Sequence, residues 1–116
     1  MKATIVNNFF DRAWEEYEKF KEEVDAFCVE NDIDPSLIKT EMSGPHVHIK
    51  HYLTPKMWTE SLHDKLCKQF GVSLIHFDLS HWKGTHNEPH YLSYKWIYAI
   101  PCDDKFVLDY DEVLSI

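Results

Sequence analysis

The sequence predicts an α+β domain in which two amphipathic helices lie on one face of an antiparallel β-sheet. Two segments carry apolar residues at helical spacing, other short segments are typical of strands, and the order helix, strand, strand occurs twice. The chain has 116 residues and is 44% hydrophobic, which is enough for one core. We therefore expect a single domain that spans residues 1–116.

The first helix is expected after a short strand at residues 2–6, with Asn7 or Asn8 as its N-cap. The polar run that ends in Asp34 and Pro35 stops this helix, because the residue before a proline disfavours helical geometry. Glutamate and lysine occupy one side of the helix. Its apolar positions recur every three or four residues and are Phe10, Ala13, Tyr17, Phe20, Val24 and Phe27.

A hairpin and a second helix follow. Residues 36–42 and 46–53 favour extended structure and are separated by the turn residues 43–45. Thr54 and Pro55 then mark the start of the second helix, because a hydroxyl cap followed by proline at the first helical position is a common beginning. Gly71 ends it. Its apolar residues lie four apart and are Trp58, Leu62, Leu66 and Phe70.

The last two strands are expected at residues 72–80 and 91–100, with a loop at 81–90. In the first of them, Ile75, Phe77 and Leu79 fall on one side, and His76 and Asp78 on the other. The acidic remainder after Pro101 is expected to be a peripheral tail or a last edge strand. This plan is ferredoxin-like, with both helices on one face. The other face is left for function or for a partner, including a second copy in a homodimer.

The net charge of −8 is unevenly distributed. Residues 1–45 hold 5 basic and 11 acidic residues, and residues 91–116 hold 2 and 5. Residues 46–90 hold 5 and 4, and they contain all eight histidines. An anionic ligand is therefore repelled least by this middle segment. The acidic ends argue against binding to duplex nucleic acid, because lysine and arginine contacts to phosphate dominate that affinity.

The sequence shows no sign of membrane insertion or export. No run approaches the roughly 18 to 20 apolar residues that span a bilayer, and the N-terminal residues are too polar for a signal peptide. The three cysteines, Cys28, Cys67 and Cys102, are odd in number and widely separated, which favours reduced packing residues over disulfides. We expect a cytoplasmic protein without a membrane partner.

Strand alternation divides the histidines. Period two places His46 and His48 on the face opposite Val47 and Ile49. Two imidazoles at this spacing can share a divalent metal such as iron or zinc, and three protein ligands with open positions make a catalytic site. The third ligand could come from His76, Asp78, His81, His86 or His90.

Two histidines are expected outside this group. His51 shares the face of Val47 and Ile49, which indicates a hydrogen-bonded position at the edge of the core. His63 is assigned to the polar side of the second helix and therefore to solvent. Motifs for other chemistries are missing, since the chain has no G-x-S-x-G, no glycine-rich phosphate loop and no C-x-x-C.

Several short motifs within residues 43–101 occur in a recognisable order. They are the run from His46 to Tyr52, the helix end at residues 69–72, and Gly84-Thr85-His86 before a tyrosine-rich strand. This layout resembles the DOPA 4,5-dioxygenase family, whose members are small ferredoxin-like non-haem iron proteins. The resemblance implies that His46, His48 and His86 are iron or substrate ligands. The chain departs from the family's Gly-Pro-His-Pro, which here reads Gly84-Thr85-His86-Asn87, and residues 91–116 lack its further histidine.

His46-Val47-His48 is also similar to the His-hydrophobe-His motif of rolling-circle replication and transposition nucleases. That similarity implies a metal-dependent nuclease or phosphoesterase. Such enzymes use a nucleophilic tyrosine, for which Tyr91 and Tyr94 are the nearby candidates. The aromatic residues of this strand could instead stack a planar ligand or pack within the sheet.

The leading hypothesis is a metal-dependent enzyme that acts on a small molecule. His46, His48 and His86 would hold iron or zinc, and His76 and Tyr94 would be the catalytic residues that handle protons. The alternative is a non-catalytic acidic binding or inhibitor protein. Its long acidic helix would meet a basic protein partner, or its histidines would line a pocket that sequesters a small ligand.

Overall fold

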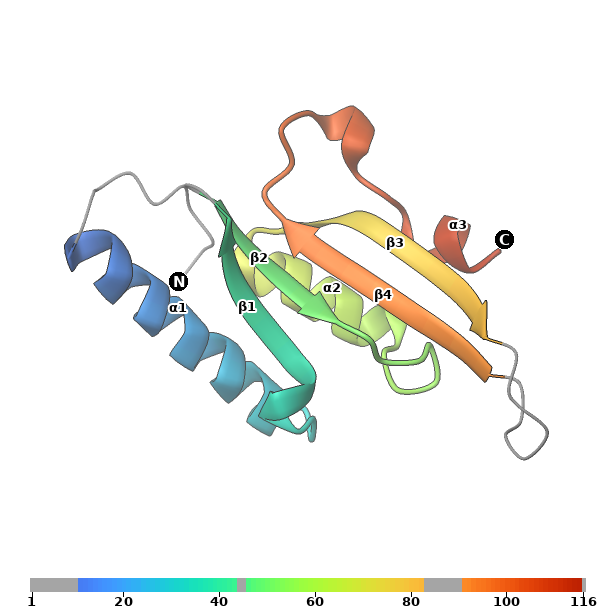
Figure 1. Cartoon of the computed structure of the whole chain (residues 1–116), viewed down its shortest axis with the longest axis horizontal. Helices are drawn as coiled ribbons and strands as arrows, with labels where there is room; N and C mark the ends of the chain where they lie inside the picture. The colour runs from blue at the N-terminus through green and yellow to red at the C-terminus, as the bar shows by residue number, and fades with distance from the viewer. Residues whose placement is uncertain (1–10, 44–45, 83–90, 116) are drawn as a thin grey trace.

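The computed structural model describes residues 11–43, 46–82 and 91–115, and these form an α+β fold (Figure 1). The elements in chain order are α1 (Asp11–Glu30), η1 (Pro35–Leu37), β1 (Ile38–Ser43), β2 (His46–His51), α2 (Glu60–Phe70), β3 (Ser73–Trp82), β4 (Tyr91–Ala99), η2 (Asp104–Phe106) and α3 (Tyr110–Leu114). The described strands make one antiparallel sheet in the order β1-β2-β4-β3. The predicted α+β class is confirmed, and the ferredoxin-like topology stays a prediction.

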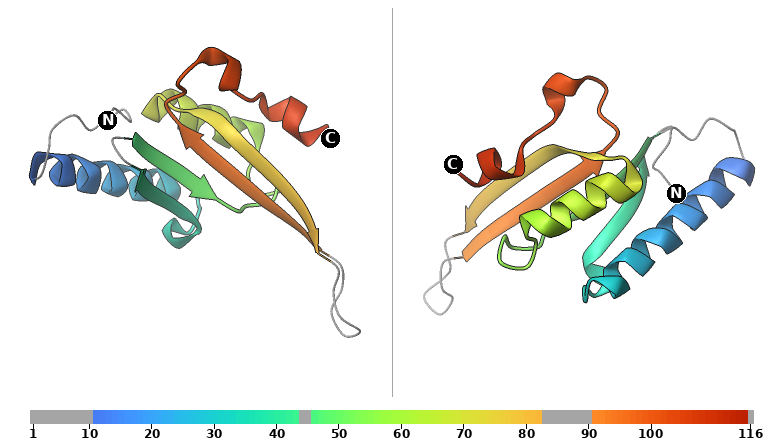
Figure 2. Two further views of the ribbon diagram at one scale, coloured as in Figure 1. Left: turned by 45° about the horizontal axis from the view of Figure 1, so that its top comes forward. Right: turned by 180° about the vertical axis from the view of Figure 1, so that it is seen from behind.

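Helices α1 and α2 lie on the same side of the sheet, as the view from behind in Figure 2 shows. The ring of Phe70 at the end of α2 meets Phe20 and Phe27 of α1 edge-to-face, with ring centroids 5.3 and 5.9 Å apart. This aromatic contact joins the two helices above the sheet. None of the helices in the described ranges combines the length and apolar character that crossing a membrane requires.

Strand alternation decides which residues enter the core. In β2, Val47, Ile49 and His51 are buried toward the helices. Ile49 lies opposite Tyr98 of β4, and His51 lies opposite Trp96. The core is therefore rich in aromatic residues at its centre. Its fully buried large side chains include Trp58, Trp96, Tyr98, Phe27, Phe70, Ile49, Leu66 and Leu74.

Helix α2 begins at Glu60 rather than next to Pro55, so the start predicted from Thr54 and Pro55 is wrong. The hydroxyl of Thr59 is the N-cap and accepts the Leu62 N–H at 3.3 Å. The preceding residue, Trp58, is fully buried outside the helix. Burial of this large side chain between the sheet and the helix sets the later start.

The predicted strand at residues 2–6 and its neighbouring cap lie outside the described residues. Strand β3 is longer than predicted, because His81 and Trp82 continue it and pair with Leu92 and Tyr91 of β4. The predicted loop therefore loses its first two residues to the sheet.

The C-terminal residues form a short helix rather than the predicted tail or edge strand. The backbone N–H of Leu108 donates to the carbonyl of Leu74 at 2.8 Å, where the chain passes the edge of β3. Asp109 then caps α3, in which Tyr110 and Val113 are buried. These apolar residues within an acidic segment complete the core on the helix side.

Replacement of Phe70 by alanine is expected to lower the free energy of unfolding by about 3 to 5 kcal/mol, because it leaves a cavity where α1, α2 and the sheet meet. Urea unfolding followed by circular dichroism measures this change. The matched control is Phe106→Ala at a ring that is 53% exposed, with an expected loss under about 1 kcal/mol. Equal losses for the two variants would contradict this packing.

Candidate functional site

The sheet face opposite the helices carries the predicted site residues His48 and His76. His48 on β2 is half-buried and lies opposite Glu41 of β1, while His76 on β3 is exposed and lies opposite Ile97 of β4. Because β4 runs between β2 and β3, two inter-strand spacings, or about 10 Å, separate the backbones of the two histidines. The structure places them on one face but does not bring them together.

His48 lines a small pocket of about 260 Å³ at one end of this face. The floor is Ala99 with Ile75, and the wall comes from the segment after β4, where Asp103 caps η2 and Phe106 follows. The lining is mainly apolar, with the imidazole of His48 and the exposed thiol of Cys102 as its polar side chains. Its residues are His48, Ile75, Ala99, Ile100, Pro101, Cys102 and Phe106.

A β-bulge places Ile75 in this pocket. Leu74 pairs with Tyr98 and His76 pairs with Ile97, so Ile75 is an extra residue in β3 without its own partner in β4. The predicted grouping of Ile75 with Phe77 and Leu79 is therefore wrong, because the bulge interrupts the alternation that the prediction assumed. Phe77 follows the bulge and faces the helix side, with its ring centroid 4.7 Å from that of Trp96.

Tyr94 lies on the opposite side of the sheet from His48 and His76. It pairs with Leu79, and its half-buried ring has its centroid 6.4 Å from that of Phe77. This position does not support a catalytic role for Tyr94 beside His48 and His76. It agrees with the other interpretation, in which the aromatic residues of β4 pack within the sheet.

The predicted metal set was His46, His48 and His86. The side chain of His46 and the whole of His86 lie outside the described residues, so this set stays a prediction. Within the described part of the chain, no three histidine, cysteine or acidic side chains are grouped so that they could hold a metal ion. The described residues thus supply one member of the set and, by themselves, no metal site.

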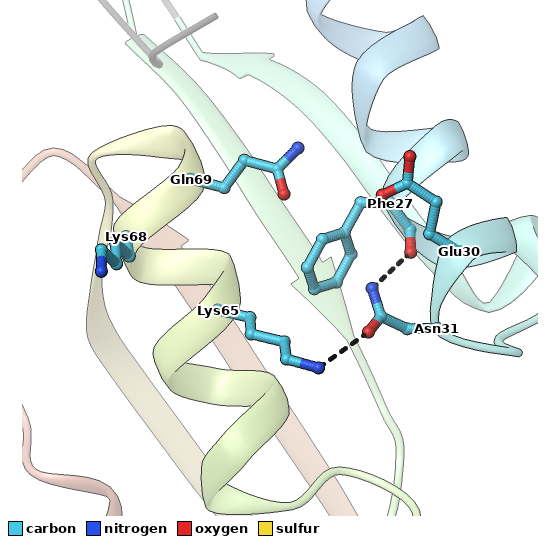
Figure 3. A pocket seen from close by; sticks show the side chains of 6 residues that line it. All are labelled: Phe27, Glu30, Asn31, Lys65, Lys68 and Gln69. Atoms are coloured by element: carbon cyan, nitrogen blue, oxygen red, sulfur yellow. Dashed lines mark hydrogen bonds between the residues drawn. The ribbon is translucent and has the colours of Figure 1, made fainter.

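A second hollow lies between α1 and α2 (Figure 3) and has a volume of about 480 Å³. The side-chain amide of Asn31 donates to the Phe27 carbonyl at 2.8 Å and accepts Lys65 Nζ at 3.5 Å. Glu30 at the end of α1 and Lys65 and Lys68 of α2 also line this hollow, and Lys65 points toward Asn31. Its charges are mixed and some of its polar groups already bond to each other, so it is better explained as a contact between helix ends.

His63 is not in solvent as predicted. It is half-buried, and its Nδ1 lies 2.7 Å from the hydroxyl oxygen of Tyr98. Trp58 Nε1, which can only donate, lies 2.8 Å from the same oxygen. His63 precedes Leu66 by three residues and Phe70 by seven, which places it beside the apolar stripe of α2. This spacing was the signal in the sequence that His63 is partly buried.

The contacts of Tyr98 constrain the protons around it. Its oxygen accepts from Trp58, and the tautomer of His63 with its proton on Nε2 leaves Nδ1 free to accept the Tyr98 proton. That Nε2 lies 3.9 Å from the sulfur of Cys67. Burial raises the pKa of the Cys67 thiol to about 11. A thiol whose pKa is raised in this way stays protonated at neutral pH, so this array lacks an activated nucleophile and is explained as structural.

His51 is fully buried, as its core-facing position predicted. Its Nδ1 accepts the Leu53 N–H at 3.2 Å, so the proton of the neutral ring sits on Nε2. No hydrogen-bond partner for Nε2 is found in the described part of the chain. The ring centroid lies 4.2 Å from that of Trp58 and 5.7 Å from that of Trp96. Burial lowers the pKa of His51 to about 3, which keeps the ring neutral.

Comparison with known proteins adds no relative. The chain matches no protein-family model, no curated protein and no solved structure. The resemblance to the DOPA 4,5-dioxygenase family therefore stays a prediction.

Acid should destabilise the protein through His51. The pKa is about 3 when folded and 6.5 when unfolded, so the unfolded state takes up the proton first as the pH falls below 6.5. At pH 4.5 this linkage removes about 3 kcal/mol from the free energy of unfolding. Burial also lowers the pKa of His63, which acts in the same direction.

The measurement is urea unfolding between pH 7.5 and 4.5 for the wild type and two variants. His51→Phe keeps an aromatic ring, and His51→Asn keeps an acceptor for the Leu53 N–H. Both are expected to be less stable at pH 7.5 but to lose less stability on acidification. A pH slope identical to that of the wild type in both variants would exclude His51 as the cause.

Proposed function

We propose that the protein binds a small, mainly apolar molecule in the His48 pocket, with the His48 imidazole as its polar anchor. The observation that carries this proposal is that a histidine singled out in the sequence lines an apolar pocket of about 260 Å³ on the sheet face opposite the helices. Pockets with a few polar groups among apolar walls are the usual form of small-molecule sites. The volume suits a ligand of about a dozen non-hydrogen atoms.

The charges of the same face favour a ligand with an acidic group. By alternation and register, the described residues of this face include Lys39, Lys50 and Lys95 against Glu41 and Asp78. Lys50 Nζ lies 3.1 Å from a carboxylate oxygen of Glu41. The pocket wall adds Lys105 against Asp103 and Asp104, so the charges of this face balance in a chain of net charge −8, and the face repels an anion less than the acidic rest of the chain does.

The probe for this proposal is 2-naphthoate, which joins an apolar body to one carboxylate. We expect it to shift the backbone amide NMR signals of residues 75, 99, 100 and 102, with His48→Ala weakening its binding about fivefold or more. The matched control is His76→Ala, which removes an exposed histidine of the same face outside the pocket. Shifts centred on Lys65 and Lys68, or equal effects of the two substitutions, would contradict the proposal.

A metal-dependent reaction on the same face is the second proposal, and it rests on the H-x-H motif. His48 projects to this face, and a metal held there with His46 and His86 would supply Lewis acidity next to the pocket. The chain itself would bind and orient the substrate through the apolar floor.

Metal content after reconstitution with iron or zinc, measured by mass spectrometry on untagged protein, tests the second proposal. We expect about one equivalent in the wild type, loss of most of it in His48→Ala, and no change in His76→Ala. Less than about a tenth of an equivalent in the wild type would refute the metal site and leave ligand binding intact.

A further inference from the structure

The C-terminal latch, defined here as residues 108–114, is a short segment docked on the helix side of the sheet. Its backbone is joined to β3 by the hydrogen bond from Leu108 N–H to the Leu74 carbonyl. Helix α3 has five residues, and its buried side chains are Tyr110 and Val113. In Figure 1 the latch is the last red segment, beyond β3. Leu108 and Leu114 also pack against the core. As a short segment outside the sheet and near the end of the described chain, the latch is a candidate for local opening.

Tyr110 contacts the core in the way a bound aromatic molecule would. Its ring is nearly parallel to that of Trp96, with an interplanar angle of 17° and centroids 5.6 Å apart. Its hydroxyl donates to the backbone carbonyl of Trp58 at 2.6 Å, and its ring centroid lies 5.3 Å from that of His63. Stacking plus one directional hydrogen bond is a common mode of aromatic recognition.

The groups beneath Tyr110 are held by bonds that do not involve the latch. Trp96 Nε1 donates to the Leu53 carbonyl at 2.8 Å, and Trp58 and His63 both bond to the Tyr98 hydroxyl. The fully buried His51, with its unpartnered Nε2–H, packs against Trp58 and Trp96. The surroundings of the Tyr110 ring are therefore held in place without the latch, and the buried His51 ring lies against two of the residues that form them.

Like charges oppose docking of the latch. The carboxyl groups of Glu60 at the start of α2 and Asp111 of α3 are in hydrogen-bond contact, which raises the pKa of Glu60. Asp64 and Asp109 add to this effect from the same two elements. At neutral pH, repulsion between these exposed carboxylates works against the apolar contacts of α3, and salt screens it.

We propose that the cage formed by Trp58, Trp96 and His63 is a binding site for a planar aromatic molecule with one O–H or N–H donor, and that Tyr110 occupies it until such a molecule displaces the latch. This site lies on the opposite side of the sheet from the His48 pocket and does not depend on the function proposed there. The ligand stacks on Trp96 and donates to the Trp58 carbonyl in place of the Tyr110 hydroxyl.

Phenol is the probe, because it is the fragment that a Tyr110→Ala substitution removes. Anisole, which has a similar ring but no donor, is its control. In the wild type, we expect phenol to increase amide hydrogen exchange of residues 108–114 about twofold or more, while amides near Trp58 and Trp96 exchange more slowly. In Tyr110→Ala, phenol should bind about tenfold more tightly than in the wild type, and anisole clearly less tightly than phenol.

The like charges at the latch allow a second, independent test of the proposal. Glu60→Gln relieves the repulsion, so phenol should bind about twofold to fivefold more weakly than in the wild type at low salt. Glu30→Gln, the same change at an exposed position on α1, should leave binding unchanged. If Tyr110→Ala does not fold, Tyr110→Phe weakens the latch by removing only the hydroxyl, and phenol affinity should rise by a smaller factor.

Two results would overturn the proposal. One is that phenol binds to Tyr110→Ala but does not speed amide exchange of the latch in the wild type. Phenol would then only fill a cavity that the substitution creates. The other is equal binding of anisole and phenol, which would remove the role of the Trp58 carbonyl.

Discussion

The buried hydroxyl of Tyr98 joins three segments of the chain by hydrogen bonds. It accepts the Trp58 N–H from the segment before α2 and is hydrogen-bonded to His63 on α2, while Tyr98 itself belongs to β4. Burial raises the pKa of this hydroxyl, so it remains protonated and can serve both bonds. A buried polar group without partners costs free energy, and satisfying all three together is what orients α2 on the sheet.

The two faces of the sheet differ because of strand alternation acting on neighbouring residues. In β4, Tyr98 enters the aromatic core, while Ile97 and Ala99 turn to the uncovered face. In β2, His51 is fully buried while His48, three residues earlier, lines the pocket. One face is thus apolar and covered by the helices, and the other carries charged side chains. The different surroundings of His48 and His51 follow from their positions in the strand.

Periodic patterns in the sequence predicted the features that depend on contacts between near neighbours in the chain. Helical periodicity found most of α1 and α2, and period two placed His48 and His51 on opposite faces. The misplaced features depend on contacts between distant residues. Trp58 enters the core because Tyr98 is there to bond it, 40 positions away. The bulge at Ile75 exists only in register with β4, so no pattern within β3 revealed it.

The segment after β4 links the two sides of the molecule. It first supplies Pro101, Cys102 and Phe106 to the His48 pocket, and then crosses the edge of β3 to bring Tyr110 to the aromatic cage. The crossing bond is made to Leu74, the residue next to the bulged Ile75 of the pocket floor. The pocket residue Ile75 and the anchor of residues 108–114 are therefore neighbours in one stretch of β3. The acidic residues of this segment are exposed, while its buried apolar residues, Tyr110 and Val113, contact the core.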